Sequence, residues 1–245
     1  MANKTALITG ITGQDGSYLA EFLLGKNYQV IGMVSAKHNI GWQNLGHIKD
    51  QVTIETGDLL DVKSLEKILV THHPHEVYNL GGITFVPLSW EQPALTFDIN
   101  ALGVARILEI IVKKLPSIRF YQASTAKIFG DPQDMPQVET TPIKPIDPYS
   151  VSKAAAHFLV QSIRQQFNLF AVNGIMYNHE SERRGPEFVT RKITLGAVKI
   201  KLGLEKNLQL GDLDAKQDWG YAADYVEAMW LMLQQDKPDD YIIAT

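Results

Sequence analysis

The sequence predicts an α/β protein in which a parallel β-sheet carries helices on both faces. Short apolar runs alternate with longer amphipathic stretches along most of the chain, as expected of repeated strand–helix units. Glycines at positions 10, 13 and 16 stand between the first apolar run and the first amphipathic one. That placement is typical of the tight strand-to-helix turn in a Rossmann-type doubly wound sheet. We therefore expect this fold, with a small substrate lobe attached.

The predicted strands are the apolar runs, and the predicted helices are the amphipathic stretches between them. Strands are expected at residues 6–9, 28–34, 53–55, 76–80, 118–123 and 170–176. Helices are expected at residues 17–24, 62–69, 100–114 and 150–167. This alternation assigns residues 1–177 to a domain that binds a dinucleotide cofactor.

The pattern changes after residue 177, where the loop-rich, charged segment NHESERRGPEF begins. Further helices are expected at residues 189–202 and 223–235, and further strands at 208–210 and 241–244. We assign residues 178–222 to the substrate lobe and residues 223–245 to a helix and strand that return to the first domain. Because the sequence stops directly after an expected strand, we expect the substrate lobe to be incomplete here.

Composition excludes several classes of function. With 245 residues, 45% hydrophobic and 20% charged, the chain is long enough for one large domain. A net charge of −4 without a basic run argues against nucleic acid, and no apolar stretch approaches the roughly 18 residues that span a bilayer. The lack of cysteine excludes disulfides and thiolate metal sites. We expect a cytoplasmic protein without a metal and without a membrane or nucleic-acid partner.

Three histidines cluster in the segment THHPHE, at positions 72, 73 and 75. Imidazole is a common metal ligand, so a metal site is one interpretation of the cluster. Pro74, however, breaks any helical spacing between the rings, and the cluster leads directly into an expected strand. A solvated helix-to-strand loop is the interpretation that the residues favour.

The glycine run GITGQDG is expected to bind phosphate. Glycines at such a turn let the backbone close on a pyrophosphate at the N-terminus of the following helix. A purely structural turn is the alternative, because glycines also end strands for conformational reasons. The strand before the run and the helix after it favour dinucleotide binding.

Tyr149 and Lys153 supply a candidate for the chemistry. They stand four residues apart in PYSVSK, so a helix places both side chains on one face. A nearby ammonium favours phenolate and should lower the phenol pKa from about 10 towards neutrality. The pair would then act as a general base for a sugar hydroxyl beside a nicotinamide. A solvated surface pair is the alternative, and the glycine turn upstream favours the catalytic role.

The end of the second strand bears on the choice of cofactor. A protein that binds NAD usually carries an acid there, which bonds the ribose 2′-hydroxyl and repels a 2′-phosphate. This chain reads Met33-Val34-Ser35-Ala36-Lys37 instead, with no acid and a cation close by. The sequence therefore favours NADP over NAD.

Several segments together resemble the GDP-mannose 4,6-dehydratase family of extended short-chain dehydrogenases/reductases. They include GITGQDGSYLAEFLL, YQAST, NLFAVNGIMYNHES and DYVEAMWLMLQ, and the resemblance runs over nearly the whole chain. It implies that NADP oxidises C4 of a GDP-sugar, that water leaves across C5 and C6, and that hydride returns to C6. It also implies a homodimer or homotetramer, and family members extend well beyond residue 245.

The resemblance also assigns roles to individual residues. Tyr149 would take the O4 proton, Lys153 would hold the nicotinamide ribose, and Thr125 would hydrogen-bond the sugar. The cofactor contacts implied are Gly10, Thr12, Gly13, Gln14, Asp15, Gly16, Ser35, Lys37, Asp58, Leu59, Leu80, Gly81, Thr84, Tyr149, Lys153, His179 and Arg184. The substrate contacts implied are Thr84, Thr125, Asn178, Val189, Lys192 and Gln217.

The sequence departs from the family pattern at the expected reacting centre. Lys127 stands where the family carries the glutamate that removes the C5 proton. An ordinary lysine stays protonated near neutral pH and can act as a base only where desolvation or another cation lowers its pKa. Gln217 replaces an arginine that pairs with the diphosphate, the segment at residues 83–86 differs, and Leu95 replaces a tyrosine that faces the cofactor. The family's arginines near Ser35 are also absent.

Three functions therefore remain open. The first is a 4,6-dehydratase acting on GDP-mannose or a related GDP-sugar, which the overall resemblance supports and Lys127 opposes. The second is a C4 epimerase or 4-keto-sugar reductase, which keeps the chemistry of Tyr149 and Lys153 without elimination. The third is a non-catalytic relative that binds nucleotide.

Overall fold

The structure is a computed structural model that describes residues 4–36, 42–131 and 135–245. Lys37, one of the expected cofactor contacts, lies outside these residues. In the described part of the chain, no helix combines the length and apolarity needed to cross a membrane. Nor do three or more acidic, histidine or cysteine side chains gather there as a metal site would require.

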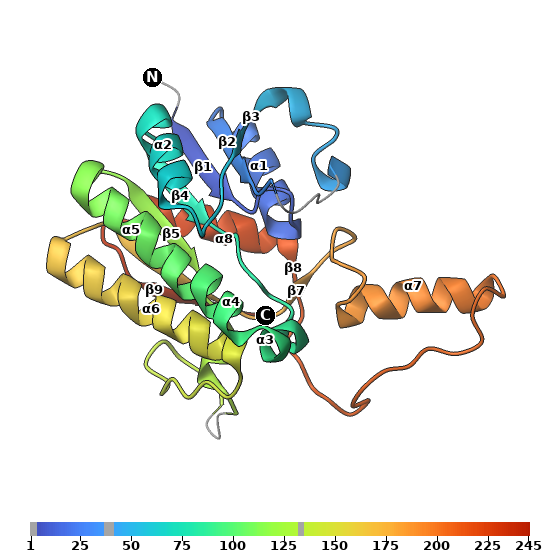
Figure 1. Ribbon diagram of the computed structural model, residues 1–245. Coiled ribbons are helices and arrows are strands. Elements are labelled where there is room, and N and C mark those ends of the chain that lie inside the picture. Colours follow the sequence, from blue (N-terminus) through green and yellow to red (C-terminus); the bar gives the residue numbers. More distant parts are fainter. Residues whose placement is uncertain (1–3, 37–41, 132–134) are drawn as a thin grey trace.

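The centre of the molecule is a parallel sheet whose seven strands follow the order β3-β2-β1-β4-β5-β6-β9 (Figure 1). The strands are β1 Thr5–Thr9, β2 Gln29–Val34, β3 Val52–Thr56, β4 Glu76–Asn79, β5 Arg119–Ala123, β6 Ala171–Met176 and β9 Asp240–Ile243. The chain moves outward from β1 to β3 and then crosses back to β4, so the direction of winding reverses beside β1. Sheets of this kind bind ligands outside the carboxyl ends of the strands at that reversal. The expected Rossmann-type fold is confirmed.

Helices cover both faces of this sheet because its strands alternate their side chains between two apolar layers. On one face, α1 (Gln14–Gly25) and α8 (Ala222–Gln234) pack over Ala6 and Ile8 of β1. On the other face, α2 (Val62–His72), α5 (Gly103–Lys114) and α6 (Pro148–Phe167) pack over Leu7. Helix α8 thus belongs to the helical layer on one face, and β9 pairs with β6 in the sheet.

Two short helices precede α5 that the sequence analysis did not anticipate. They are α3 (Val86–Glu91) and α4 (Pro93–Phe97), followed by the π-helical turn η3 (Asp98–Leu102). Each of the two helices carries a proline in its first turn. Proline is tolerated there because the missing N–H would have no partner within the helix. The prolines therefore begin helices in this segment instead of ending them.

The expected strand at residues 208–210 is wrong. These residues form no strand in the structure, and they have no neighbouring strand with which to pair. Leu208 packs instead against α7 (Val189–Lys201), where a Cβ added to Gly196 would approach Leu208 Cδ1 to 2.7 Å. The short strands of this region are β7 (His179–Glu180) and β8 (Gly220–Tyr221), which pair with each other.

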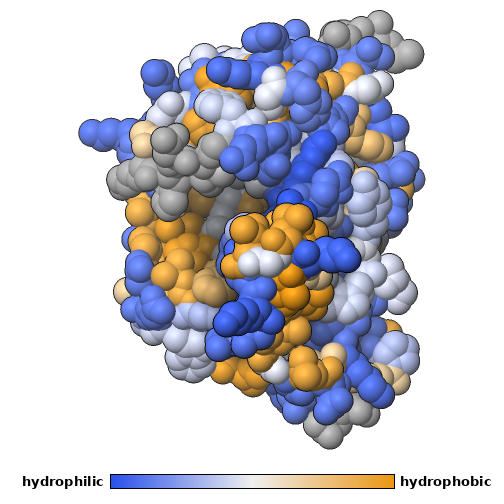
Figure 2. Space-filling view, turned by 90° about the vertical axis from the view of Figure 1, so that its right-hand side faces the viewer, coloured by the Kyte–Doolittle hydropathy of each residue, from blue (hydrophilic) through white to orange (hydrophobic). Residues whose placement is uncertain are grey.

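Helix α7 extends away from the sheet, and a long loop leads back from its end to β8 (Figure 1). Large apolar side chains are exposed along the helix and this loop, and an apolar area stands out on the corresponding face in Figure 2. The exposed apolar residues of the helix and the loop include Val198, Leu202, Leu204 and Leu213. The helix meets the candidate site at its first residue, Val189.

The histidine cluster lies at the end of α2, as the loop interpretation expected. His72 Nε2 lies 2.8 Å from Glu55 Oε1, and His73 ends the helix in a left-handed conformation with φ of 43°. His75 Nδ1 accepts a hydrogen bond from the Thr5 backbone N–H at 3.0 Å. The rings of His72 and His75 thus connect the end of α2 to β3 and the start of β4 to β1, respectively. The remaining short elements are the 3-10 turns η1 (Trp42–Asn44), η2 (Lys49–Gln51) and η4 (Ala126–Phe129).

Candidate active site

Two neighbouring cavities open at the carboxyl ends of the central strands. The first, of about 300 Å³, is lined by the glycine turn, the end of β2 and the segments that follow β3 and β4. The second, of about 350 Å³, is lined by the end of β5, the start of α6 and the segment before α7. Asp15, Leu80, Thr84 and Arg184 line both. A ligand that fills the first cavity would therefore reach the second.

The glycine turn fits a phosphate-bearing ligand. Gly10 has φ of +69°, and a Cβ there would lie 2.9 Å from the backbone of Gly81. A Cβ on Gly16 would lie 2.4 Å from the Gly10 carbonyl oxygen. Gly13 provides the N-cap of α1 without any side-chain hydrogen bond, which leaves the first N–H groups of the helix facing the cavity. The turn therefore has the close backbone and free donors that a pyrophosphate needs.

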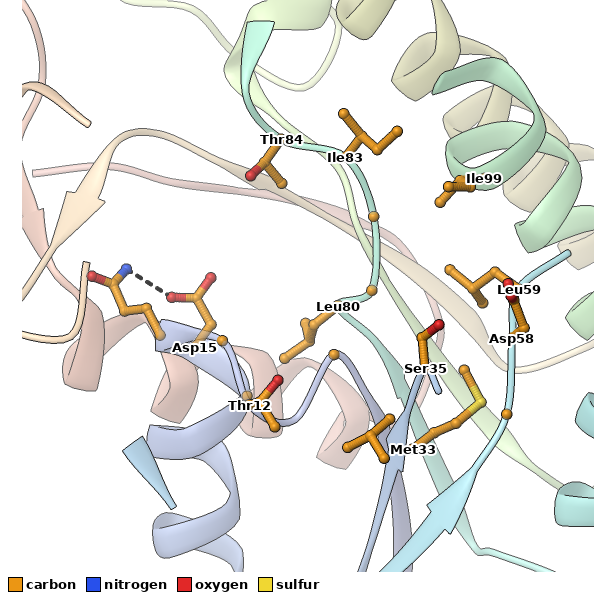
Figure 3. A pocket seen from close by; sticks show the side chains of 18 of the residues that line it. Thr12, Asp15, Met33, Ser35, Asp58, Leu59, Leu80, Ile83, Thr84 and Ile99 are labelled. Carbon is orange, nitrogen blue, oxygen red and sulfur yellow. Dashed lines mark hydrogen bonds between the residues drawn. The ribbon is translucent and has the colours of Figure 1, made fainter. Parts of the chain in front are cut away.

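The first cavity lies between two groups of side chains (Figure 3). Asp15 and Thr84 lie at one end, while Ser35, Asp58 and Leu59 lie at the other. Asp58 Oδ1 accepts a hydrogen bond from the Leu60 N–H at 3.0 Å, which fixes the turn after β3. The structure thus places the expected cofactor contacts in one cavity: Gly10, Thr12, Gly13, Gln14, Asp15, Gly16, Ser35, Asp58, Leu59, Leu80, Gly81, Thr84 and Arg184. The other expected contacts in the described chain, Tyr149, Lys153 and His179, line the second cavity.

Tyr149 and Lys153 lie near the start of α6, whose position is fixed by a capping box between Asp147 and Ser150. Both side chains are buried, with 8% and 4% of their surface exposed, so they do not form a solvated surface pair. Lys153 Nζ donates a hydrogen bond to the Ala123 carbonyl oxygen at 2.9 Å and lies 5.9 Å from the centre of the Tyr149 ring.

The pKa of Tyr149 is shifted in the direction opposite to the one expected. Burial raises the pKa of Tyr149 to about 12, against a hydrogen bond from Thr125 and the charge of Arg184, which both lower it. Burial also lowers the pKa of Lys153 to about 8. The expected fall of the phenol pKa towards neutrality is therefore wrong for the protein alone, because desolvation outweighs the nearby positive charge.

Asp15 and His179 form an ion pair between the two cavities. His179 Nε2 lies 2.9 Å from Asp15 Oδ2, and His179 Nδ1 lies 2.7 Å from the Tyr177 carbonyl oxygen. Since both ring nitrogens face acceptors, the imidazolium form is the one that satisfies them. Burial alone would lower the pKa of His179, but the Asp15 carboxylate outweighs burial and raises it. The ring also stacks on Tyr225 with 4.4 Å between centroids.

Lys127 lines the second cavity with an exposed side chain. Its N–H donates to Thr125 Oγ1 at 3.2 Å, so Thr125 begins the short turn η4 that carries it. Among the described residues, the carboxylates that line this cavity belong to Asp15 and Glu187. Glu187 was not anticipated, because nothing in the sequence places it opposite β5.

The expected substrate contacts are only partly brought together. Asn178 and Val189 line the second cavity with Thr84 and Thr125. Gln217 is not among the described lining residues, but it accepts a hydrogen bond from Asn178 Nδ2 at 2.8 Å. Lys192 lies on the exposed side of α7 and lines neither cavity. The Gln217 contact shows how a residue of the long loop could act through Asn178.

Asn100 is a site residue that sequence reasoning missed. It lies in the turn η3 with 2% of its surface exposed. Its side chain accepts from the Ile83 N–H and donates to the Ile83 carbonyl, both at 2.9 Å, and donates to Ser152 Oγ at 3.1 Å. It thereby fixes the segment after β4 against α6. An asparagine between apolar helical residues was the available signal, since buried amides need partners.

Comparisons with known proteins match this chain to one protein family. The family model described as GDP-mannose 4,6 dehydratase matches residues 7–245. The GDP-mannose 4,6 dehydratase of Homo sapiens is 50% identical over 252 residues, which cover 99% of this chain and 68% of that protein. The GDP-mannose 4,6-dehydratase of Vibrio cholerae is 48% identical over 251 residues, with the same two shares.

Solved structures share the fold at lower identity. A UDP-glucose 4-epimerase from Thermotoga maritima, solved with UDP-glucose, superposes with a TM-score of 0.87 at 23% identity and covers 98% of this chain and 77% of its own. A dTDP-glucose 4,6-dehydratase from Bacillus anthracis, solved with NAD, has a TM-score of 0.85 at 23% identity, with shares of 98% and 75%. These likenesses show the fold. Since the family model spans nearly the whole sequence and the relatives are about half identical, this chain belongs to the GDP-mannose 4,6-dehydratase family.

Proposed function

We propose that this chain is an NADP-dependent lyase that removes water from a GDP-sugar, in the manner of a GDP-mannose 4,6-dehydratase. The observation that carries the proposal is the joining of two cavities, one built on the glycine turn and one containing Thr125, Tyr149 and Lys153. The half-identical relatives are GDP-mannose 4,6-dehydratases, which supports the substrate class. The reaction would oxidise C4 of the sugar, remove water across C5 and C6, and restore hydrogen at C6.

The residues of the first cavity fit NADP. The first turn of α1 would hold the pyrophosphate, while Asp58 and Leu59 would contact the adenine. Ser35 stands where an NAD-binding chain usually places an acid, which supports the preference for the 2′-phosphate. When bound, NADP would supply the redox chemistry at C4 and C6. Calorimetric titration with NADP and NAD tests this preference: we expect NADP to bind more tightly, and equal or reversed affinities would contradict it.

The residues of the second cavity would handle protons and hold the sugar. Tyr149 would take the O4 proton, for which it must first be a phenolate. Arg184 and the Thr125 hydrogen bond favour that form against the effect of burial. Lys153 would hold the nicotinamide ribose, with His179 and Arg184 on the adjoining side of the cofactor. Asn178, supported by Gln217, and Val189 would hold the GDP end of the substrate.

A second function is favoured by one observation, the exposed amine of Lys127 at the second cavity. A C4 epimerase or 4-keto-sugar reductase needs Tyr149 and Lys153 but no base at C5. In that function Lys127 would have no proton to remove. Under either function we expect a cytoplasmic homodimer or homotetramer, which light scattering after gel filtration would measure.

The product identifies the function. Purified protein would be incubated with NADP and a panel of GDP-, UDP- and dTDP-hexoses, and the nucleotide sugars would be analysed by mass spectrometry. A product lighter by one water, formed from a GDP-hexose, is the expected result. A C4 epimer of unchanged mass, identified by NMR, would establish a C4 epimerase instead, and an unchanged panel would contradict both the dehydratase and the epimerase. A 4-keto-sugar reductase would need a separate assay with NADPH and a 4-keto-sugar. Tyr149→Phe is the control, since it should abolish turnover and leave the NADP affinity nearly intact.

A further inference from the structure

The face of α6 that carries the catalytic pair continues one turn further to His157. Tyr149, Lys153 and His157 follow one another at intervals of four residues, so their side chains lie in one row. Lys153 Nζ binds the Ala123 carbonyl, and His157 Nδ1 lies 3.3 Å from the hydroxyl oxygen of the next residue, Ser124. His157 and Ser124 are 2% and 5% exposed, and Ser124 lines the second cavity. Ser124 has no role in the function proposed above.

The hydrogen bonds of Asp240 and Gln161 determine which ring nitrogen of His157 carries the proton. Asp240 Oδ1 accepts from Arg164 Nη2 and from Asn173 Nδ2, each at 2.9 Å. Its other oxygen, Oδ2, lies 2.6 Å from Gln161 Nε2. Because a carboxylate can only accept, Gln161 must present its amide nitrogen to Asp240. The same nitrogen lies 3.1 Å from His157 Nε2, whereas Asp240 Oδ2 lies 3.6 Å from Nε2, which is too long for a hydrogen bond. Nε2 therefore accepts from Gln161.

The tautomer of His157 follows from this chain of bonds. With Nε2 accepting, the ring proton is on Nδ1, which donates to Ser124 Oγ. Burial lowers the pKa of His157, against Asp240, and so favours the neutral ring that this arrangement needs. Since Ser124 Oγ accepts from His157, its own hydrogen must be donated elsewhere. The second cavity, beside Thr125 and Tyr149, is the space that Ser124 faces.

We propose that Ser124 contacts the substrate by donating its hydroxyl hydrogen to an oxygen of the sugar, and that His157 is the positioning residue that makes Ser124 a donor. This inference rests on the proposed function for the nature of the substrate, a GDP-sugar. A ketone oxygen can only accept a hydrogen bond. The donor would therefore suit a sugar that carries a carbonyl at C4 during the reaction, and it would supplement Thr125 and Tyr149 there.

Binding measurements test the proposal without requiring turnover. The affinities of GDP-mannose and of GDP would be measured by calorimetry in the NADP-saturated protein, and their ratio isolates the contact with the sugar. Ser124→Ala should lower this ratio about 3- to 10-fold, the range expected for one hydrogen bond, with little change for GDP itself. His157→Gln should have a similar effect, because its amide replaces Nε2 and leaves Nδ1 without a counterpart. His157→Asn places an amide nitrogen where Nδ1 lies and should restore most of the ratio.

The double variant separates positioning from general disturbance. If His157 acts through Ser124, then His157→Gln should add little to Ser124→Ala. The inference would be overturned if the two substitutions lowered the affinity ratio independently, so that their effects multiplied in the double variant. It would also be overturned if Ser124→Ala had the affinity ratio of the wild type, or if the wild type bound GDP-mannose no better than GDP. Thermal unfolding shows whether each variant is folded, and Ser124→Ala keeps the test decisive if the His157 variants are not. A wild type that binds the sugar through Ser124 yet forms no product would contradict only the proposed function.

Discussion

Lys153 is an ammonium held in a buried site, and that position has a measurable effect on stability. The pKa of Lys153 falls to about 8 through burial, from an ordinary value of 10.5. A lowered lysine pKa means that the charged amine destabilises the folded state. This destabilisation is complete at pH values below the folded-state pKa of about 8 and disappears as the pH rises towards the ordinary pKa of 10.5. The residue that would hold the cofactor ribose is therefore expected to destabilise the fold at neutral pH.

Lys153→Met should raise the stability of the protein at pH 7 while it abolishes turnover. The buried charge disappears and a side chain of similar length remains, for an expected gain on the order of 1–3 kcal/mol, reduced by the lost bond to Ala123. The gain should shrink between about pH 8 and pH 10.5. Chemical denaturation across this range measures it, with Lys113→Met as control, because Lys113 is an exposed lysine. A variant less stable than wild type at pH 7 would contradict the assignment.

Lys127 lines the second cavity at the position where the family resemblance implies the C5 base. A general base contributes typically about 10²–10⁴-fold, so a protein with an exposed lysine in place of the family's glutamate should dehydrate its substrate slowly. Lys127→Glu should raise the rate of dehydration, measured by mass spectrometry of the product, because it restores a carboxylate. Lys127→Gln is the matched control, since it removes the charge without supplying a base.

The comparison between the two Lys127 variants decides the role of this position. Equal rates in Lys127→Glu and Lys127→Gln would show that the base lies elsewhere. Glu187→Gln would then test the other carboxylate of the cavity that is not paired with His179. Fast dehydration by the wild type, lost in Glu187→Gln, would transfer the role of base to Glu187.

At the scale of elements, the Asp15–His179 pair ties the first turn of α1 to β7. The raised pKa of His179 contributes stability that is complete below its ordinary value of 6.5 and is lost as pH rises through the raised one. The lowered pKa of Asp15 contributes stability above its ordinary value of 3.8, which is lost as pH falls through the lowered one. The ion pair therefore stabilises the junction between the two cavities from mildly acidic to neutral pH.

His179→Gln should destabilise the protein by about 1.5–3 kcal/mol near pH 6, because it keeps a neutral donor but loses the charge-assisted bond. The difference from wild type should close as pH rises through the raised pKa of His179, where the wild-type ring also becomes neutral. Unfolding free energies at pH 6, 7.5 and 9.5 would measure this trend. A difference that stays constant over that range would show that the ring acts through packing on Tyr225 and not through its charge.

The strands and helices show which elements could be predicted from the sequence. Apolar runs predicted each strand of the central sheet, because buried parallel strands need continuous apolar sequence. The run at residues 208–210 has the same character, yet a strand also needs a partner, and sequence does not say which runs will find one. The two helices that carry Pro87 and Pro93 in their first turns were not predicted, because proline interrupts the interior of a helix but is also tolerated in its first turn.

At the scale of the whole molecule, the sequence predicted which residues would lie together in the first cavity better than it predicted their electrostatics. Glycine spacing predicted the position of the first turn, and the resemblance to the dehydratase family implied the other residues that line this cavity. The pKa of Tyr149 depends on how completely the folded chain buries it, which no local spacing encodes. The bonds from Ser124 through His157 and Gln161 to Asp240 join three distant segments and became visible only in three dimensions.

The fate of the hydrogen on C4 tests the account most directly. Wild-type protein with NADP would be incubated with GDP-mannose that carries deuterium at C4, and the product would be analysed by mass spectrometry and NMR. We predict a 4-keto-6-deoxy product that has lost one water and carries at C6 the deuterium that was at C4 of the substrate. The reason is that the two cavities would keep cofactor and sugar together throughout the reaction. Deuterium that stays at C4 of an epimer, or of unchanged substrate, would contradict the assignment of this chain as a dehydratase.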